Sequence, residues 1–203
     1  MANSLTAGSS PTPHGAIILA RHGEPALARN VMLSAREYAA FWAKYEIGGI
    51  LPDQSPPERL RKFVAESGTL VSSTRLRAIQ SARTMVGERV FPHHEILIEA
   101  PLPPPNFPSW FKLSPKLWGF TARVWWWYFN HHAGEESRAE AEARADAAAA
   151  MLIELAEGGQ NVVVLAHGFF NHLIGRSLKR KHGWKLVESE GYKYWSMRRF
   201  ERS

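Results

Sequence analysis

The sequence of 203 residues contains no cysteine and no long apolar run. The absence of cysteine excludes a disulfide framework, a thiolate nucleophile and every cysteine-ligated metal site. No apolar run approaches the roughly 18 residues that a membrane-spanning helix needs. Residues 1–14 combine neither the basic segment nor the apolar segment of a secretory signal, so we expect a flexible leader there and a cytoplasmic protein.

The composition is that of a basic, globular chain. Hydrophobic residues make up 45% of it, which is enough for the core of one domain, and we expect that domain to span residues 15–203. Lysine and arginine number 25 against 19 acidic residues, giving a formal net charge of +6. This charge favours anionic partners but leaves phosphorylated small molecules, nucleic acid and a membrane surface open.

Apolar runs alternate with helical patterns along the whole chain, and this alternation is typical of an α/β domain with a mostly parallel sheet. Strands are predicted at residues 16–20, 69–73, 95–99, 161–166 and 192–200. Helices are predicted at residues 34–46, 57–66, 75–89, 137–157 and 169–182. We therefore predict a three-layer α/β/α sandwich.

An aromatic-rich insertion is expected at about residues 101–133, where five of the eight tryptophans are concentrated. Within it, residues 115–130 are apolar nearly all around a helix. Such a helix is either buried beneath the domain or at a dimer contact, or it forms a lid over a binding site, or it contacts a membrane surface. Membrane contact is the least favoured of the three, and the oligomeric state stays open.

Polar residues follow three of the predicted strands. These segments read "RHGE" at 21–24, "SSTRLRAIQSA" at 72–82 and "AHG" at 166–168. Ligands of parallel α/β sheets gather at the carboxyl ends of the strands. If these ends are neighbours, four side chains converge on one small pocket without an intervening carboxylate: Arg21, His22, Arg77 and His167. Such a cluster of donors suits the three peripheral oxygens of a phosphate.

A histidine in this cluster has a second possible use, because a neutral imidazole is a competent nucleophile when a hydrogen bond holds its far nitrogen. We predict this role for His22. Phosphoryl transfer also needs an acid that protonates the leaving alkoxide, and Glu99 is the carboxyl group at the end of the predicted strand 95–99.

We assign no catalytic or ligand-binding role to the other histidines and basic residues discussed next. The paired histidines are interpreted as solvated loop residues and not as metal ligands, because no histidine–carboxylate spacing supports a site: His93, His94, His131 and His132. The basic run at 176–185 is interpreted as a solvated helix end. We therefore predict no metal, no cofactor and no nucleic-acid partner.

The three motifs, in this order and each after a predicted strand, resemble those of the histidine phosphatase superfamily, which includes the phosphoglycerate mutases and many small phosphomonoesterases. The resemblance covers about residues 15–200 without the insertion and implies a phosphoglycerate mutase-like fold. It also implies that His22 forms a phosphohistidine, that Arg21, Arg77 and His167 bind the phosphoryl oxygens, and that Glu99 is the general acid and base. Glu24 is the alternative acid.

The first motif departs from many family members, which have an asparagine at the position of Ala28. The segment after Glu99 also lacks the substrate-binding pattern of the mutases. We therefore predict a metal-independent phosphatase acting on a small phosphorylated molecule. The alternatives are a mutase and a phosphate-binding regulatory module with little turnover.

Overall fold

The computed structural model describes residues 14–202. The predicted leader, residues 1–14, lies outside this range except for its last residue. The strands are β1 (Ile17–Arg21), β2 (Thr69–Ser73), β3 (His93–His94), β4 (Val162–Ala166), β5 (Trp184–Ser189) and β6 (Met197–Arg202). The helices are α1 (Ala35–Ile47), α2 (Glu58–Glu66), α3 (Leu76–Val86), α4 (Pro115–Phe129), α5 (Arg138–Leu155) and α6 (Gly168–Lys181), with a 3₁₀ turn, η1, at Glu95–Leu97.

The six strands form one sheet in the order β3-β2-β4-β1-β6-β5. The pairs β1–β4, β2–β4 and β2–β3 are parallel, whereas β6 runs antiparallel to both β1 and β5. The predicted mostly parallel sheet is therefore confirmed, with an antiparallel edge. Strand β4 lies inside the sheet and is buried along its whole length, as its apolar sequence predicts.

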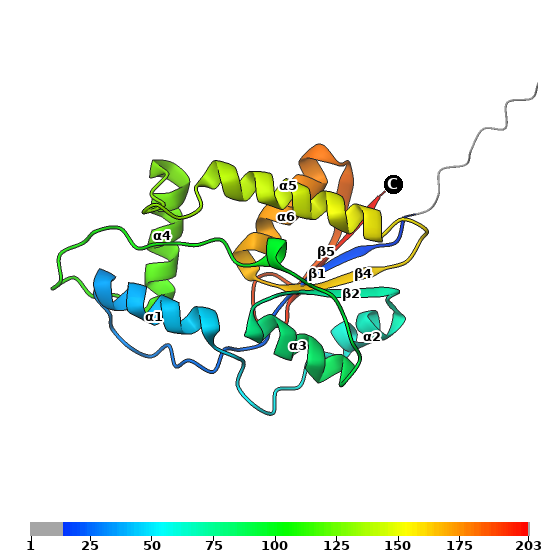
Figure 1. Cartoon of the computed structure of the whole chain (residues 1–203), viewed down its shortest axis with the longest axis horizontal. Coiled ribbons are helices and arrows are strands. Elements are labelled where there is room, and N and C mark those ends of the chain that lie inside the picture. The colour runs from blue at the N-terminus through cyan, green and yellow to red at the C-terminus, as the bar shows by residue number, and fades with distance from the viewer. Residues whose placement is uncertain (1–13, 203) are drawn as a thin grey trace, which may run out of the picture.

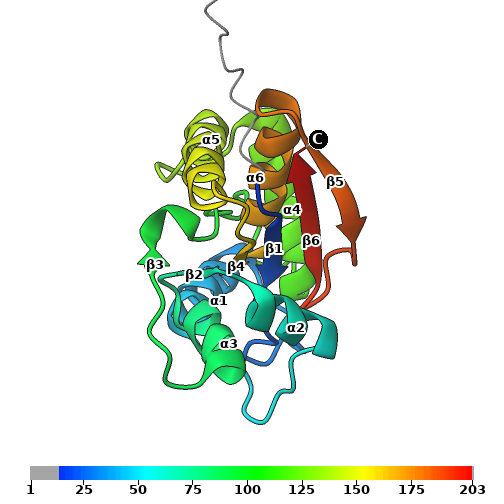
Figure 2. The same cartoon turned by 90° about the vertical axis from the view of Figure 1, so that its right-hand side faces the viewer.

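Helices cover both faces of the sheet, which gives the predicted three layers (Figure 2). Successive side chains of β1 point to opposite faces, so Ile17 and Leu19 join the core beneath α5 and α6, while Ile18 and Ala20 join the core beneath α2 and α3. Helix α5 buries a stripe of small residues against its neighbours, and these alanines permit close approach: Ala141, Ala145, Ala148 and Ala149.

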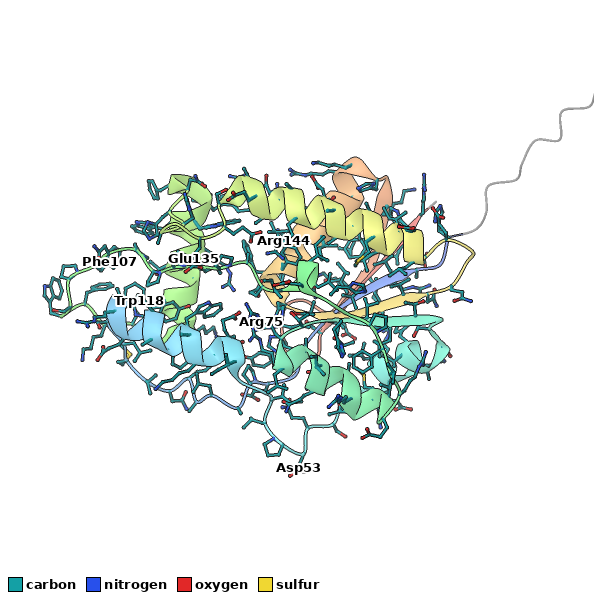
Figure 3. The ribbon with its side chains drawn as sticks, in the orientation of Figure 1. Asp53, Arg75, Phe107, Trp118, Glu135 and Arg144 are labelled. Carbon is teal, nitrogen blue, oxygen red and sulfur yellow. The ribbon has the colours of Figure 1, made fainter. Side chains whose placement is uncertain are left out.

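The insertion contributes α4, which packs against α1 beyond the carboxyl ends of the central strands (Figure 1). The two helices share a third, separate aromatic core built on Tyr38 and the fully buried Trp118, with Phe107 and Phe111 of the preceding loop against it. Trp118 lies where α4 meets α1 (Figure 3), and its indole Nε1 donates a hydrogen bond to the carbonyl of Leu33 at 2.6 Å. We call α1, α4 and residues 101–114 the cap.

The five predicted helices are confirmed, with small changes at their ends. Two of them begin with complete capping boxes, in which Ser34 pairs with Glu37 and Ser137 pairs with Glu140. Across residues 14–202, none of the helices combines the length with the apolarity that crossing a bilayer demands.

The predicted strand at 95–99 is wrong, and the predicted strand at 192–200 is confirmed only from residue 197 onward. Residues 95–99 form the η1 turn followed by coil, because β3 pairs with β2 over only His93 and His94 before the chain turns. Residues 192–196 form a loop in which Trp195 has a φ of 64°, a value that no strand accommodates, so β6 begins only at Met197. The sequence interpretation also missed β5, which it assigned in part to a solvated helix end.

Candidate active site

The carboxyl ends of β1, β2 and β4 lie next to one another at one edge of the sheet. In the parallel register, Arg21 at the end of β1 stands opposite Ala166 at the end of β4, and β2 flanks β4 on its other side. His22 and His167 directly follow β1 and β4, so sheet geometry alone brings them together. Their ring centroids are 5.2 Å apart.

His22 is buried, with 2% of its surface exposed, and its backbone is fixed on both sides. Its N–H donates to the carbonyl of Ala166 at 3.0 Å, and its carbonyl accepts from the N–H of Trp195 at 3.3 Å. The ring Nδ1 lies 2.7 Å from the carbonyl oxygen of Gly23. A carbonyl oxygen only accepts, so Nδ1 carries the proton and Nε2 presents its lone pair.

His167 is fully buried at the N-cap position of α6, and its Nε2 lies 2.9 Å from Oγ of Ser73 at the end of β2. Burial lowers the pKa of His167 well below its ordinary value, and the charge of Arg77 lowers it further. Burial likewise lowers the pKa of His22, with Arg77 and Arg21 adding to the effect. Both imidazoles are therefore neutral near pH 7.

The Arg77 guanidinium is paired with a carboxylate, that of Glu46. The expectation of a cluster without a carboxylate was therefore wrong. Glu46, the penultimate residue of α1, accepts a hydrogen bond from Nη2 of Arg77 at 2.8 Å and forms an ion pair with Arg75 at 2.9 Å. Nη1 of Arg77 donates to the carbonyl of Tyr45 at 2.9 Å. The Arg77 side chain is 0% exposed, and a guanidinium buried so deeply requires an opposite charge beside it.

Several donors around the two histidines have no partner among residues 14–202. These buried donors are Nε of Arg21, Nε of Arg29 and Nε of Arg77; Nδ1 of His167 also has no partner, and it is a donor where the Ser73 hydroxyl donates to Nε2. Buried polar groups are nearly always hydrogen-bonded in a complete structure, so a group of orphaned N–H atoms indicates the place of an anionic ligand with several acceptors.

Arg29 is a site residue that the sequence interpretation missed. Its charge contributes to the lowered pKa of His22, its side chain lines the cavity beside the histidines, and it donates a hydrogen bond to the hydroxyl of Tyr194. It stands one position after Ala28, where many family members have asparagine. Its position a few residues after "RHGE" was the sequence signal that could have identified Arg29 as a further phosphate-binding candidate.

Glu99 lies at the N-terminus of α6, the helix whose N-cap is the buried His167. Its carboxylate accepts hydrogen bonds from the backbone N–H groups of Phe170 at 2.8 Å and Phe169 at 3.3 Å, and it lines the cavity. Arg144 of α5 holds the segment that precedes it, donating to the carbonyls of Ile96 and Ile98 at 2.8 and 2.9 Å. Glu99 therefore lies at the cavity although residues 95–99 form no strand, and its role as the acid stays a prediction.

Glu24, the alternative acid, lies elsewhere. It is exposed and does not line the cavity, and its backbone pairs with the side chain of Gln54. Gly23 beside it has a structural reason to lack a side chain, because a Cβ there would lie 2.4 Å from the indole of Trp195. The glycine admits the loop between β5 and β6, which covers His22.

That loop forms a wall over the histidines. Tyr192 accepts a hydrogen bond from Nη1 of Arg21 through its carbonyl at 2.6 Å, and the ring of Tyr194 lies 4.3 Å from the Arg21 guanidinium and 5.9 Å from the His22 ring. These contacts engage part of the donor set of Arg21. Among the described residues, no cluster of three or more metal-ligating side chains is present.

A cavity of about 1150 Å³ opens from this edge of the sheet toward the cap. Helices α1 and α4 and the N-terminus of α6 form its walls, so the insertion helix is partly buried and partly a wall of the cavity. On the side of the sheet, the lining includes Arg21 at the end of β1, Glu99 in the coil after η1 and Gly168 at the start of α6. We call the group Arg21, His22, Arg77 and His167 the strand-end pocket, and of these four Arg21 lines the cavity.

Solved structures share this fold. The phosphoserine phosphatase of Entamoeba histolytica, solved with 3-phosphoglyceric acid, is 16% identical over 91% of this chain and 89% of that one, with a TM-score of 0.54. A mutant of that protein, solved with phosphoserine, gives 15% identity, the same coverage and the same TM-score. An α-ribazole-5′-phosphate phosphatase described as putative, from Escherichia coli, is 18% identical over 81% and 79%, with a TM-score of 0.50.

A comparison with curated protein sequences finds no match. The family model of the histidine phosphatase superfamily (branch 1) matches residues 56–197, which is more than half of the chain. The match includes the second and third motifs, and "RHGE" precedes it. The chain belongs to the histidine phosphatase superfamily, branch 1.

Proposed function

We propose that the protein is a metal-independent phosphatase that hydrolyses a phosphomonoester through a phosphohistidine on His22. The observation that carries this proposal is the state of the His22 ring. Its Nδ1–H is bound to the carbonyl of Gly23, and burial and neighbouring cations keep the ring neutral, so the Nε2 lone pair is available for attack on phosphorus.

In the first step, Nε2 of His22 forms a bond to phosphorus while the bond from phosphorus to the ester oxygen breaks. Glu99 gives its proton to the departing alkoxide. In the second step, water attacks the phosphohistidine, the P–N bond breaks, and Glu99 takes a proton from the water. The products are the alcohol and inorganic phosphate, and the enzyme returns to its starting state.

The orphaned donors of Arg21, Arg29, Arg77 and His167 support this role, because they offer positive charge and N–H groups to the phosphoryl oxygens. Their positions are set by buried backbone and side-chain contacts before a ligand arrives. Donors that need no reorganisation stabilise the charge of the transition state most effectively.

The test compares two histidines that cap the same helix. Hydrolysis of p-nitrophenyl phosphate is measured with and without a chelator for the wild type, His167→Ala and His182→Ala, since His167 and His182 are the N-cap and C-cap of α6. We expect chelator-insensitive turnover that His167→Ala lowers by at least about 100-fold and His182→Ala leaves intact. A requirement for added metal contradicts the proposal. Tight phosphate binding without turnover points to the regulatory module, and transfer to a second alcohol points to the mutase.

The acid is tested with a matched pair of carboxylate variants. Glu99→Gln removes the proton donor, so turnover of an alkyl phosphate, whose leaving group needs a proton, falls much more than turnover of p-nitrophenyl phosphate. Glu24→Gln should affect both substrates equally and weakly. The reverse result assigns the acid to Glu24.

A further inference from the structure

The cavity extends well beyond the strand-end pocket. The strand-end pocket meets the cavity at Arg21, whereas the cavity, with a volume of about 1150 Å³, continues to the cap. Ligand cavities of this size hold most of a drug-sized molecule. The outer part of the cavity therefore faces the group that the phosphate leaves behind.

The charges that line the cavity are almost all positive. Its cations are Arg21, Arg29, Lys116, Arg123 and Lys193, and Glu99 is its one carboxylate. Within residues 14–202, none of these five cations forms an ion pair with a carboxylate. Glu99 is itself bound by the backbone at α6. Unpaired cations gathered around a cavity favour an anionic occupant.

Two of these cations lie apart from the strand-end pocket, on α4. Lys116 and Arg123 are seven residues apart and so lie on one face of the helix, with Gly119 and Phe120 between them at the cavity wall. The Arg123 guanidinium lies 5.3 Å from the ring centroid of Phe169, the second residue of α6. Within residues 14–202, its side chain donates one hydrogen bond, to the carbonyl of Gly119 at 3.3 Å, and this leaves most of its N–H groups free.

Aromatic rings form the wall between the two groups of cations. Tyr38, Trp42 and Tyr45 follow one another along the cavity side of α1, with ring centroids 6.2 Å apart for the first pair and 5.1 Å for the second. Phe120 of α4 also lines the cavity although 65% of it is exposed. Tyr38 and Tyr45 are buried, at 1% and 4% exposure, so the half-buried Trp42 and the exposed Phe120 present the ring faces on which another aromatic ring stacks.

We propose that the substrate is a phosphomonoester of nucleotide size whose leaving group carries an aromatic ring and a second negatively charged group, bound by Lys116 and Arg123. A nucleoside bisphosphate has this chemistry. The inference rests on the proposed function, because the orientation of the substrate assumes that the reacting phosphate lies at His22. The alkyl tail of a lipid phosphate would pack against the aromatic rings but leave Lys116 and Arg123 without an anionic partner. Lipid phosphates are therefore expected to be poorer substrates than nucleoside bisphosphates.

The test uses four substrates that vary the ring and the second anion independently. They are adenosine 3′,5′-bisphosphate, adenosine 5′-monophosphate, fructose 1,6-bisphosphate and glycerol 3-phosphate. We expect the highest kcat/KM for the first. Lys116→Gln and Arg123→Gln should each lower kcat/KM for the nucleoside bisphosphate at least about tenfold more than for the monophosphate, because a charge-assisted contact is lost only with the former.

Lys112→Gln is the matched control, since Lys112 is an exposed lysine outside the cavity four residues before Lys116. It should leave the ratio between the two nucleotides unchanged. Equal losses on both nucleotides in the α4 variants overturn the proposal, and so does a preference for lysophosphatidate over the nucleoside bisphosphate.

A binding measurement separates this inference from the proposed function. Calorimetry with His22→Ala, its fold checked by circular dichroism, measures affinity for the two nucleotides without turnover, and the same titration with wild type and inorganic phosphate gives the reference. Tighter binding of the bisphosphate that Arg123→Gln abolishes supports the inference even if p-nitrophenyl phosphate is not hydrolysed. Hydrolysis of p-nitrophenyl phosphate without any bisphosphate preference overturns the inference alone.

Discussion

The strand-end pocket, which reaches the cavity through Arg21, and the cap, which walls it, are held in place by different interactions. In the strand-end pocket, backbone hydrogen bonds and buried polar contacts fix each side chain, as for His22 between Ala166 and Trp195. In the cap, the packing of aromatic rings around Trp118 and Tyr38 holds the two helices together, and several rings are exposed. Polar networks are intolerant of small shifts, whereas aromatic packing on helices accommodates them.

This difference separates chemistry from selectivity. Changes in the strand-end pocket should alter kcat for every substrate, because all substrates present the same phosphoryl group there. Changes in the cap should alter the ranking of substrates through KM. The predictions below use pairs of similar substitutions in the two regions, from the largest effect to the smallest.

Gly23→Ala should be the most damaging small substitution. The added Cβ would lie 2.4 Å from the Trp195 ring and 2.9 Å from Oε1 of Gln54, so the loop over His22 must move. We expect kcat/KM for p-nitrophenyl phosphate to fall about 100-fold, since such displacements misplace the nucleophile. The free energy of unfolding should fall by about 1–3 kcal/mol in urea titrations. Unchanged activity would show that this loop does not position His22.

Glu46→Gln should destabilise the protein by about 2 kcal/mol, because the fully buried Arg77 loses its counter-charge. Inorganic phosphate should restore part of this loss if it binds against Arg77, and it should therefore stabilise the variant more than the wild type. Thermal unfolding with and without phosphate measures both effects. Glu37→Gln is the control on the same helix, remote from Arg77, and equal stabilisation of both variants would place the phosphate elsewhere.

The two histidines should make stability depend on pH. Their pKa values in the folded protein lie below the ordinary value of about 6.5, so the unfolded chain binds more protons than the folded chain as pH falls below about 6.5. Their stabilising contribution is complete above that pH and is lost below it, with a slope of up to about 1.4 kcal/mol per pH unit for each. His22→Asn should flatten urea-derived stability between pH 7.5 and 5.5. An unaltered slope contradicts the neutral state of His22.

Gly119→Ala should be the mildest change and the counterpart of Gly23→Ala. Gly119 lies inside α4, and a Cβ there would have its nearest neighbour, the hydroxyl oxygen of Tyr38, at 3.5 Å, an ordinary contact. Replacing a helical glycine by alanine should raise the free energy of unfolding by about 0.5–1 kcal/mol. Turnover of p-nitrophenyl phosphate should be retained, and a loss comparable to that of Gly23→Ala would end the distinction between the two regions.

The sequence predicted the fold and the gathering of motifs because both depend on local signals. Capping boxes mark the starts of α1 and α5, and an apolar run marks β4. Polar residues directly after parallel strands meet at one edge without any knowledge of side-chain packing. This is why His22 and His167 could be expected together.

The remaining features depend on contacts between distant segments, which no local pattern reveals. Glu46 reaches Arg77 across 31 residues, and Arg144 holds the backbone before Glu99 across 46 to 48 residues. The apolar segment 95–99 resembled a strand, but β3 ends after His94 and Leu97 enters the core from a turn instead. Tertiary packing decides such short segments.

The central claim is that His22 carries the phosphoryl group. Rapid quenching of the reaction with a ³²P-labelled aryl phosphate, followed by peptide mapping under basic conditions that preserve phosphohistidine, tests it most directly. We predict one labelled site, at the imidazole of His22, that forms and decays within a turnover and is missing from His22→Ala. Label on another residue, or a His22→Ala protein that still turns over the substrate at the wild-type rate, would contradict it.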